Sequence, residues 1–312
     1  WGVQFAGGNA NALSQENPVQ INYYVNEEVH NLAVGYSKVL KKGSGYLATA
    51  EVNAGDAAFT VCDEWGSDNG VVTVSRNVKV SGTVADAGFA SAFTFVTDPS
   101  VKWEDVSFLA PGLLYGDSSY DGPNSPGGTN FDAAHVFTFR EDFLPSPMYG
   151  MRFSNGNTFT MLDAAPDATT TLKETQEGMG ESTMVSDVFA TGAFSSKDAA
   201  DGGVQISFCF PNTTAVMARV PGSSKASMVW AQRFNPVNDG FEQNYTMNFR
   251  FAEEESFPEL TINSYRWAWT VLKPELFWHD IEVVRTSLSD QLSGLVTKMG
   301  DRTGLPYQVL TK

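Results

Sequence analysis

The chain has 312 residues, 42% of them hydrophobic, and its 36 acidic and 20 basic residues give a formal net charge of −16. A chain of this length can bury a sizeable core. Its acidity argues against nucleic acid and anionic membrane surfaces as partners, because the field of the whole molecule repels phosphate. No apolar run reaches the roughly 18 residues that a membrane-spanning helix requires, so we expect no membrane span.

The amino terminus leads to an expectation about localisation. The chain opens on Trp1, without an initiator Met and without a basic and then apolar leader. We therefore expect a processed or trimmed chain whose signal peptide has been removed. Such a chain would be exported, to the periplasm or to the extracellular space.

Up to about residue 260 the sequence has the patterns that are typical of strands and turns. Asn-Gly pairs at 69–70 and 155–156 each separate two strand-like runs, and both residue types tolerate the positive φ of a tight hairpin. Apolar and polar residues alternate over 240–251, with Gln243 as the exception on the apolar parity. Hairpins without intervening helices indicate antiparallel sheets, so the sequence predicts a mainly β protein, a large antiparallel β-sandwich.

The segment 111–130 is a long stretch dominated by Gly, Ser, Pro, Asn and Asp. Loops of this length inside a compact domain are usually functional or disordered. Tyr115 and Tyr120 could stack on a sugar ring. Asp117 and Asp121 could bind sugar hydroxyls or help to hold calcium. The alternative interpretation is a mobile surface loop.

Three consecutive charges, Arg140, Glu141 and Asp142, follow in a chain that is otherwise poor in charge. In a strand, Arg140 and Asp142 would share one face and Glu141 would point the other way. A glycosidase needs two carboxylates at a defined separation across the scissile bond, so the triplet is a poor acid/base pair. We expect it to brace a strand end, and the alternative is a rim that contacts substrate.

The sequence pattern changes from strand-like to helical near residue 260. Over 275–299, apolar residues recur at spacings of three and four, which predicts one long amphipathic helix starting after Pro274 and ending at Gly300. Residues 264–272 fit either a helix or a strand. The long helix could lie across the sandwich or link it to a further domain, and we expect a β domain over 1–260 and a helical linker over 261–312.

Most familiar catalytic signatures are absent from the sequence. The three histidines do not form a zinc-binding pair, and no nucleophile elbow, phosphate-binding loop or dinucleotide fingerprint occurs. Cys62 and Cys209 lie in apolar strand-like runs, with a spacing that fits no metal or redox motif. We expect no cofactor, no metal site and two buried free thiols, although the thiols could pair if the fold brings them together.

Five segments in order resemble one protein family. They are FLAPGLLYG (108–116), REDFLPSPMYGMRF (140–153), LDAAPDATTT (162–171), FNPVNDGFEQNY (234–245) and SFPELTINSYRWAWTVLKP (256–274). Together they resemble the amino-terminal region of bacterial exported proteins of the six-hairpin glycosidase type. Glycoside hydrolases similar to β-glucuronidases are the nearest relatives that the resemblance suggests.

The resemblance implies a β-supersandwich, then a linker helix, then an (α/α)6 toroid that would carry most of the catalytic carboxylates. The toroid is not in this chain, so no catalytic residue is assigned and the chain alone is expected to be inactive. What carries over is a supporting role, in which sandwich loops form one rim of a cleft for glucuronic-acid-containing poly- or oligosaccharide. The candidate rim residues are Tyr115, Asp117, Tyr120, Asp121, Arg140, Glu141 and Asp142.

The expected partners follow from the same resemblance. They are carbohydrate, and either the missing helical domain or a partner subunit packed on the apolar face of 275–299. Two alternatives stay open. The chain could be a free-standing carbohydrate-binding module, since aromatic faces and a few polar groups suit sugar recognition. It could also be a structural or interaction subunit that uses the same helical face.

Overall fold

The structure is a computed structural model, and it describes residues 2–3, 13–14, 17–26, 28–102, 105–112, 114–117, 136–140, 144–165, 170–173, 182–185, 191–196, 203–211, 214–219, 226–231 and 234–304. In some of these segments only the backbone is described. The chain forms two compact units, Trp1–Leu272 and Lys273–Lys312, which are described separately.

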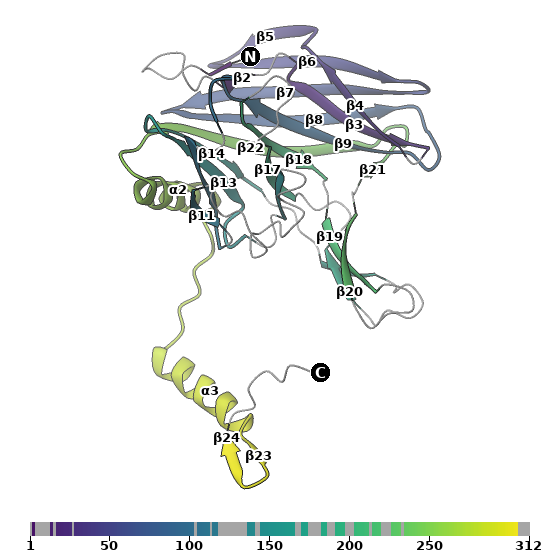
Figure 1. Ribbon diagram of the computed structural model, residues 1–312. Coiled ribbons are helices and arrows are strands. Elements are labelled where there is room, and N and C mark those ends of the chain that lie inside the picture. Colours follow the sequence, from purple (N-terminus) through teal and green to yellow (C-terminus); the bar gives the residue numbers. More distant parts are fainter. Residues whose placement is uncertain are drawn as a thin grey trace. The chain divides into compact units, whose positions relative to one another are not determined.

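Two large antiparallel sheets contain most of the described strands of the first unit (Figure 1). The first sheet contains β1 (Gly2–Val3), β2 (Leu13–Ser14), β3 (Val19–Val25), β4 (Glu28–Val34), β9 (Gly88–Val96), β12 (Val136–Arg140), β17 (Thr191–Ser196), β18 (Gln205–Phe210) and β21 (Asn235–Pro236). The second sheet has the order β11-β10-β13-β14-β22-β8-β7-β6-β5. Its strands are β5 (Lys38–Lys42), β6 (Gly45–Ala54), β7 (Ala57–Asp68), β8 (Val71–Ser81), β10 (Val106–Ala110), β11 (Leu114–Asp117), β13 (Met148–Phe153), β14 (Asn157–Asp163) and β22 (Glu242–Glu253).

Two further hairpins in the first unit pair β15 (Thr170–Lys173) with β16 (Ser182–Val185), and β19 (Thr214–Arg219) with β20 (Ala226–Ala231). Both predicted Asn-Gly turns occur, between β7 and β8 and between β13 and β14. Asn69, Gly70 and Gly156 have positive φ angles, which explains why these residue types stand there.

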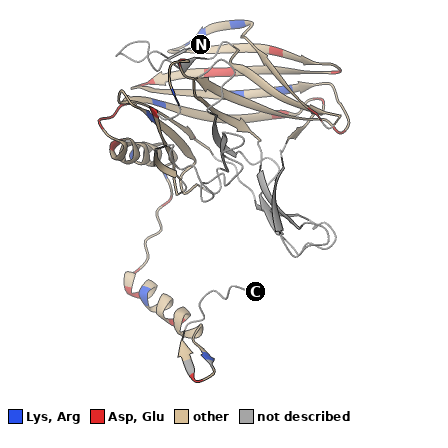
Figure 2. Ribbon diagram, in the orientation of Figure 1, with Lys and Arg blue, Asp and Glu red and all other residues tan. Residues whose placement is uncertain are grey.

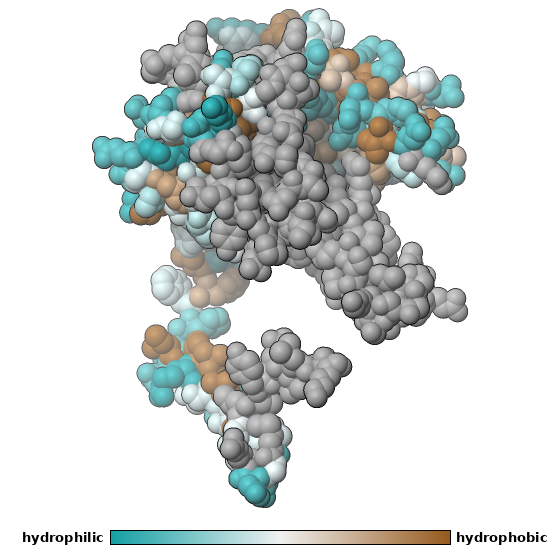
Figure 3. Space-filling view, in the orientation of Figure 1, coloured by the Kyte–Doolittle hydropathy of each residue, from teal (hydrophilic) through white to brown (hydrophobic). Residues whose placement is uncertain are grey.

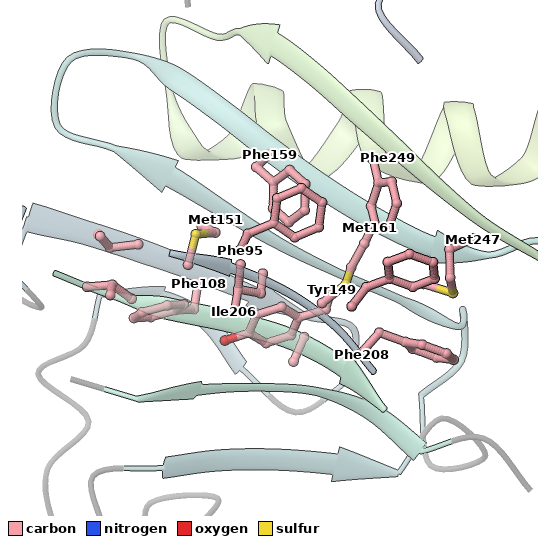
Figure 4. Packing of buried hydrophobic residues seen from close by; sticks show 14 of the residues in the cluster. Phe95, Phe108, Tyr149, Met151, Phe159, Met161, Ile206, Phe208, Met247 and Phe249 are labelled. Atoms are coloured by element: carbon pink, nitrogen blue, oxygen red, sulfur yellow. The ribbon is translucent and has the colours of Figure 1, made fainter. Parts of the chain in front are cut away.

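The inner faces of the two sheets meet in an aromatic core (Figure 4). Phe95 on β9 packs against Phe159 on β14 and Phe249 on β22, with ring centroids 4.7 Å and 4.9 Å apart. Phe208 on β18 belongs to the same cluster. Contacts between the faces of two antiparallel sheets define a sandwich, so the predicted mainly β sandwich class is confirmed.

The structure also explains Gln243, the polar exception in the alternation predicted for 240–251. Gln243 faces the core with its neighbours of the same parity and is buried. Its amide nitrogen donates to the carbonyl of Phe210 at 2.9 Å, and its amide oxygen accepts from the Ser91 hydroxyl. A polar residue is tolerated here because both ends of its amide are satisfied.

Helix α2 (Phe257–Leu272) covers part of the outer face of the second sheet. Leu260 and Ala268 pack on Leu109 and Leu162, and the Ser264 hydroxyl bonds that of Thr160 at 2.9 Å. Residues 264–272 are therefore helical, and the strand alternative is wrong. The expected division at 260 and 261 falls inside this helix, whereas the compact units divide after Leu272.

The second unit contains helix α3 (Ile281–Gly294) and the hairpin of β23 (Thr297–Met299) and β24 (Arg302–Gly304). The predicted helix over 275–299 is too long at both ends. Asp280 is the N-cap, because its carboxylate accepts from the amides of Glu282 and Val283 at 2.8 Å and 3.2 Å. Residues 273–280 are not helical, and the last residues of the predicted helix form β23 instead.

Cys62 and Cys209 are both free thiols, as expected. Cys209 is buried, and burial raises the pKa of its thiol to about 12. Cys62 is only half-buried, so the expectation of burial holds for one of the two. Among the residues that the structure describes, no helix is both long enough and apolar enough to cross a membrane.

Candidate functional site

The structure describes only three of the seven predicted rim residues. Tyr115 lies in β11 and its side chain is described. Asp117 and Arg140 are the last residues of β11 and β12, with their backbones alone described. The remaining four, Tyr120, Asp121, Glu141 and Asp142, lie outside the described residues. Strand β11 ends the order of the second sheet and β12 ends that of the first.

Tyr115 is exposed by 53%, yet its hydroxyl is held in place. The phenolic oxygen accepts a hydrogen bond from the amide of Gly112 at 2.9 Å, and it lies 3.0 Å from the hydroxyl of Tyr265 on α2. We call Tyr115 and Tyr265 the tyrosine couple. The couple ties the β10–β11 turn to a helix 150 residues further along the chain.

The turn that carries Gly112 also touches the proline-rich segment before β13. Gly112 has a φ of +76°, and a Cβ added to it would lie 3.0 Å from the Cδ of Pro145. Glycine is thus required both by the backbone conformation and by the close approach. Two segments that the sequence marked as candidates, 111–130 and 140–149, therefore meet through Gly112 and Pro145.

In the contacts of the described residues, the tyrosine couple keeps one hydroxyl proton available. It has two such protons, and the bond between the two oxygens uses one of them. Burial, followed by the bond to Tyr115, raises the pKa of Tyr265 to about 12. A tyrosine hydroxyl is protonated at neutral pH even at its ordinary pKa of 10.0, so the couple can donate a hydrogen bond to a ligand oxygen.

Trp269 extends the aromatic surface along α2. It lies four residues after Tyr265, on the same side of the helix, and is exposed by 56%. The neighbouring face of α2 carries the buried residues Leu260, Ser264 and Ala268, and partly buried Tyr265 packs against the cluster that contains Leu260 and Ala268. Tyr115, Tyr265 and Trp269 are the candidate functional site, with two exposed aromatic faces and one hydroxyl donor.

Sequence reasoning did not identify Tyr265 or Trp269. The signal was present in residues 264–272, because positions 265 and 269 share a face in a helix and in a strand alike. What the sequence could not indicate is that Tyr265 meets Tyr115, since that contact depends on how α2 packs on the sheet.

A second constellation is sealed between the sheets. Arg76 on β8 donates from Nε and Nη2 to the two carboxylate oxygens of Asp63 on β7, at 2.8 Å and 2.7 Å. Its guanidinium carbon lies 3.8 Å from the ring centroid of Phe93. Both charged side chains are fully buried. They cannot touch a substrate in this conformation, so we interpret the pair as structural.

Two aromatic residues connect this buried pair to the surface. The hydroxyl of Tyr36 donates to Asp63, and the indole nitrogen of Trp65 donates to the Tyr36 oxygen at 3.2 Å. Burial and the nearby Asp63 carboxylate raise the pKa of Tyr36 above its ordinary value. On Arg76, burial alone would lower the pKa, but the Asp63 charge outweighs it and the pKa is raised.

The fold thus defines the chain as an antiparallel β-sandwich protein with a helix on one sheet. No family model matches the sequence, and no curated protein matches it. Among solved structures, the chain is similar to a 4-alpha-glucanotransferase from Thermococcus litoralis, with 10% identity and a TM-score of 0.27 over 75% of this chain. It is also similar to a protein from the human microbiome named as a kojibiose phosphorylase, with 8% identity and a TM-score of 0.34 over 92% of this chain.

The matched region spans 27% of the first of these proteins and 29% of the second. The chain therefore corresponds to less than a third of either protein's length. Both TM-scores are too low to establish a shared fold, and both identities are too low to establish shared chemistry.

Proposed function

We propose that this chain is the non-catalytic β-sandwich portion of an exported carbohydrate-active enzyme, a glycoside hydrolase that acts on glucuronic-acid-containing poly- or oligosaccharide. The tyrosine couple is the observation that carries this proposal. Tyr115 is exposed yet fixed, at the place where the β10–β11 turn, the segment before β13 and α2 converge. The resemblance to six-hairpin glycosidases supports the same role.

In this role the chain shapes one rim of a cleft and supplies no catalytic carboxylate. Aromatic faces and a small number of placed polar groups suit the apolar ring faces and the hydroxyls of sugars. Tyr115 and Trp269 provide the faces, and the tyrosine couple provides the donor. Asp117, Tyr120, Asp121 and the triplet 140–142 would extend the rim.

The apolar face of α3 supports the presence of a further helical domain or a partner subunit. Apolar residues at helical spacing on this face are all exposed, namely Ile281, Val284, Leu288, Leu292 and Leu295. Figure 3 shows hydrophobic surface on the second unit. Exposed contiguous apolar surfaces of this kind mark interaction sites. In the proposal, the catalytic helical domain packs on this face.

Saccharide binding tests the role of the couple. We expect the 312-residue chain to bind glucuronoxylan oligosaccharides weakly by calorimetric titration. Tyr265→Phe removes one hydroxyl and is expected to weaken binding about fivefold, the loss of one hydrogen bond. Thr270→Val, at an exposed position of the same helix, is the matched control and should leave binding unchanged.

Three results would contradict the proposal. Turnover of these oligosaccharides by the chain alone would mean that it contains its own catalytic groups. A coding sequence without a helical domain after Lys312, together with intact saccharide binding, would favour the alternative of a free-standing carbohydrate-binding module. Absence of saccharide binding would favour a structural subunit that uses the α3 face.

A further inference from the structure

A second aromatic surface lies at the opposite edge of the second sheet from the tyrosine couple. Among the strands that the structure describes, β5 ends the sheet order and pairs with β6 alone. Three of its five residues are lysines, and every residue of the strand is exposed. Figure 2 shows this strand as a site of positive charge on a chain whose net charge is −16.

One face of this edge places a cation beside an aromatic ring. Lys41 is directly opposite Tyr46 on β6, and Tyr46 is directly opposite Trp65 on β7. Val39, two residues before Lys41, shares the face. Tyr46 and Val39 are exposed by 52% and 55%. The sandwich core therefore does not cover this part of the sheet's inner face.

The charges around this face leave Lys41 unneutralised. Lys42 is bound to Glu64 at 2.8 Å, but both of these residues have the parity of the other face. On the face of Tyr46, the acidic residue of the adjacent strand is Asp63, and it is engaged by Arg76. In the described contacts, neither the ammonium of Lys41 nor the hydroxyl of Tyr46 has a partner.

Hydrogen bonds to a buried carboxylate hold the neighbouring Trp65 in place. The indole nitrogen of Trp65 donates to Tyr36, and Tyr36 donates to the buried carboxylate of Asp63. Trp65, which is opposite Tyr46 on the neighbouring strand, is therefore held in place. A fixed neighbour limits the side-chain freedom that ligand binding would have to remove.

We propose that Lys41, Tyr46 and Val39 form a subsite for an acidic saccharide. The uronate carboxylate binds the Lys41 ammonium, and the apolar face of the sugar ring packs on Tyr46. This inference rests on the proposed function and adds a second contact region to it, at the far edge of the same sheet. An exposed ion pair contributes little by itself, so a polymer that repeats the uronate is the suitable ligand.

The geometry favours a saccharide over an acidic peptide. A peptide strand would add to the outer edge of β5, because no strand in the described part of the chain pairs with that edge. It would then lie roughly 10 Å from β6, two strand spacings away. It could reach Lys41 but would not cover Tyr46. A ligand that contacts both residues lies across the face of the sheet.

Calorimetric titration of the full chain with polygalacturonate tests the subsite. Its fully methyl-esterified form is the matched probe, since it keeps the sugar rings and removes the charge. We expect the acid form to bind at least about fivefold more tightly than the ester. Lys41→Gln should remove this preference, and Tyr46→Ala should weaken the binding of both polymers. Circular dichroism confirms that each variant is folded.

Lys79→Gln is the control, because Lys79 is an exposed lysine of the same sheet on its outer face, near Glu242. It should bind polygalacturonate as the parent chain does. Equal affinity for acid and ester, binding unaffected by Lys41→Gln and Tyr46→Ala, or no binding of polygalacturonate would each overturn the subsite. Equally tight binding of polyglutamate would overturn the saccharide assignment.

The outcome is separable from that of the proposed function. Tyr265→Phe should leave polygalacturonate binding at Lys41 and Tyr46 unchanged. If the chain alone turned over oligosaccharides, the proposed domain role would fail while binding that depends on Lys41 would stand. If Tyr265→Phe weakened glucuronoxylan binding and Lys41→Gln changed nothing, the subsite alone would fail.

Discussion

Asp63 and Arg76 carry opposite charges at facing positions of β7 and β8, and neither side chain has exposed surface. On β8, Arg76 separates Val74, which belongs to the larger hydrophobic cluster, from Val78, which belongs to the smaller. The Nη1 of Arg76 donates a hydrogen bond to the carbonyl oxygen of Ala92 on β9, at 2.8 Å. One side chain therefore joins two strands of one sheet to the other sheet.

Removing the arginine should be far more harmful than removing an exposed lysine. Arg76→Met leaves the Asp63 carboxylate buried without its partner, and we expect the free energy of unfolding to fall by about 3–5 kcal/mol. Urea denaturation measures the change. Lys42→Met breaks the exposed pair with Glu64 and should change it by less than about 1 kcal/mol. Similar values for both variants would show that the buried pair is not needed for stability.

Tyr245, beside Arg76 on β22, gives a pH dependence at the same scale. Burial raises its pKa to about 12 from the ordinary value of 10.0, although Arg76 opposes the shift. The unfolded chain loses this proton first as the pH rises. The stability due to protonated Tyr245 is therefore complete below pH 10 and is lost between pH 10 and about 12.

Urea midpoints measured from neutral pH upwards check this expectation. The parent chain should lose stability over that alkaline interval, and Tyr245→Phe should lose less because it has no proton to release. An identical pH profile for the two proteins would contradict the buried, protonated state of Tyr245.

At the scale of elements, single residues set the ends of helices, and the periodicity of apolar residues does not reveal them. The apolar spacing over 275–299 extends past both ends of α3. Lys273 has a φ of 44°, which ends α2, and Asp280 caps the next helix. The residues between Lys273 and Asp280 continue the apolar spacing of the helix but are not helical.

Removal of the cap should loosen the start of α3. Asp280→Ala frees the amides of Glu282 and Val283, and we expect a loss of about 0.5–2 kcal/mol in local helix stability. Amide hydrogen exchange at these two residues should accelerate accordingly. Asp290→Ala, at an exposed position inside the helix, is the control and should leave both rates unchanged.

At the scale of the whole molecule, the exposed apolar face of α3 governs association. We expect the isolated chain to self-associate as its concentration rises, because the described residues of the second unit leave this face exposed. Leu288→Lys with Leu292→Lys should keep the chain monomeric in light scattering. Thr286→Lys with Ser293→Lys adds the same charge on the opposite side of the helix and should not. A monomeric parent chain without exposed apolar surface would contradict both the docking face and the proposed further domain.

Local patterns were sufficient to predict the sandwich. Alternation over 240–251 and the Asn-Gly pairs at 69–70 and 155–156 each depend on neighbours in the sequence, so the strands and their hairpins could be predicted. The spacing of Cys62 and Cys209 fits no metal or redox motif, which favoured free thiols and left their pairing open until the structure showed both thiols free.

The sequence by itself determined the fold class, since periodicity and turn residues act over a few positions. Tertiary structure alone decided which residues lie together: the hydroxyl of Tyr115 beside that of Tyr265, Gly112 against Pro145, and Lys41 opposite Tyr46 on neighbouring strands of an uncovered face. These contacts depend on strand register, on the packing of α2 and on how far one sheet covers the other. Each of these is fixed by the packing of the whole core, which no local pattern encodes.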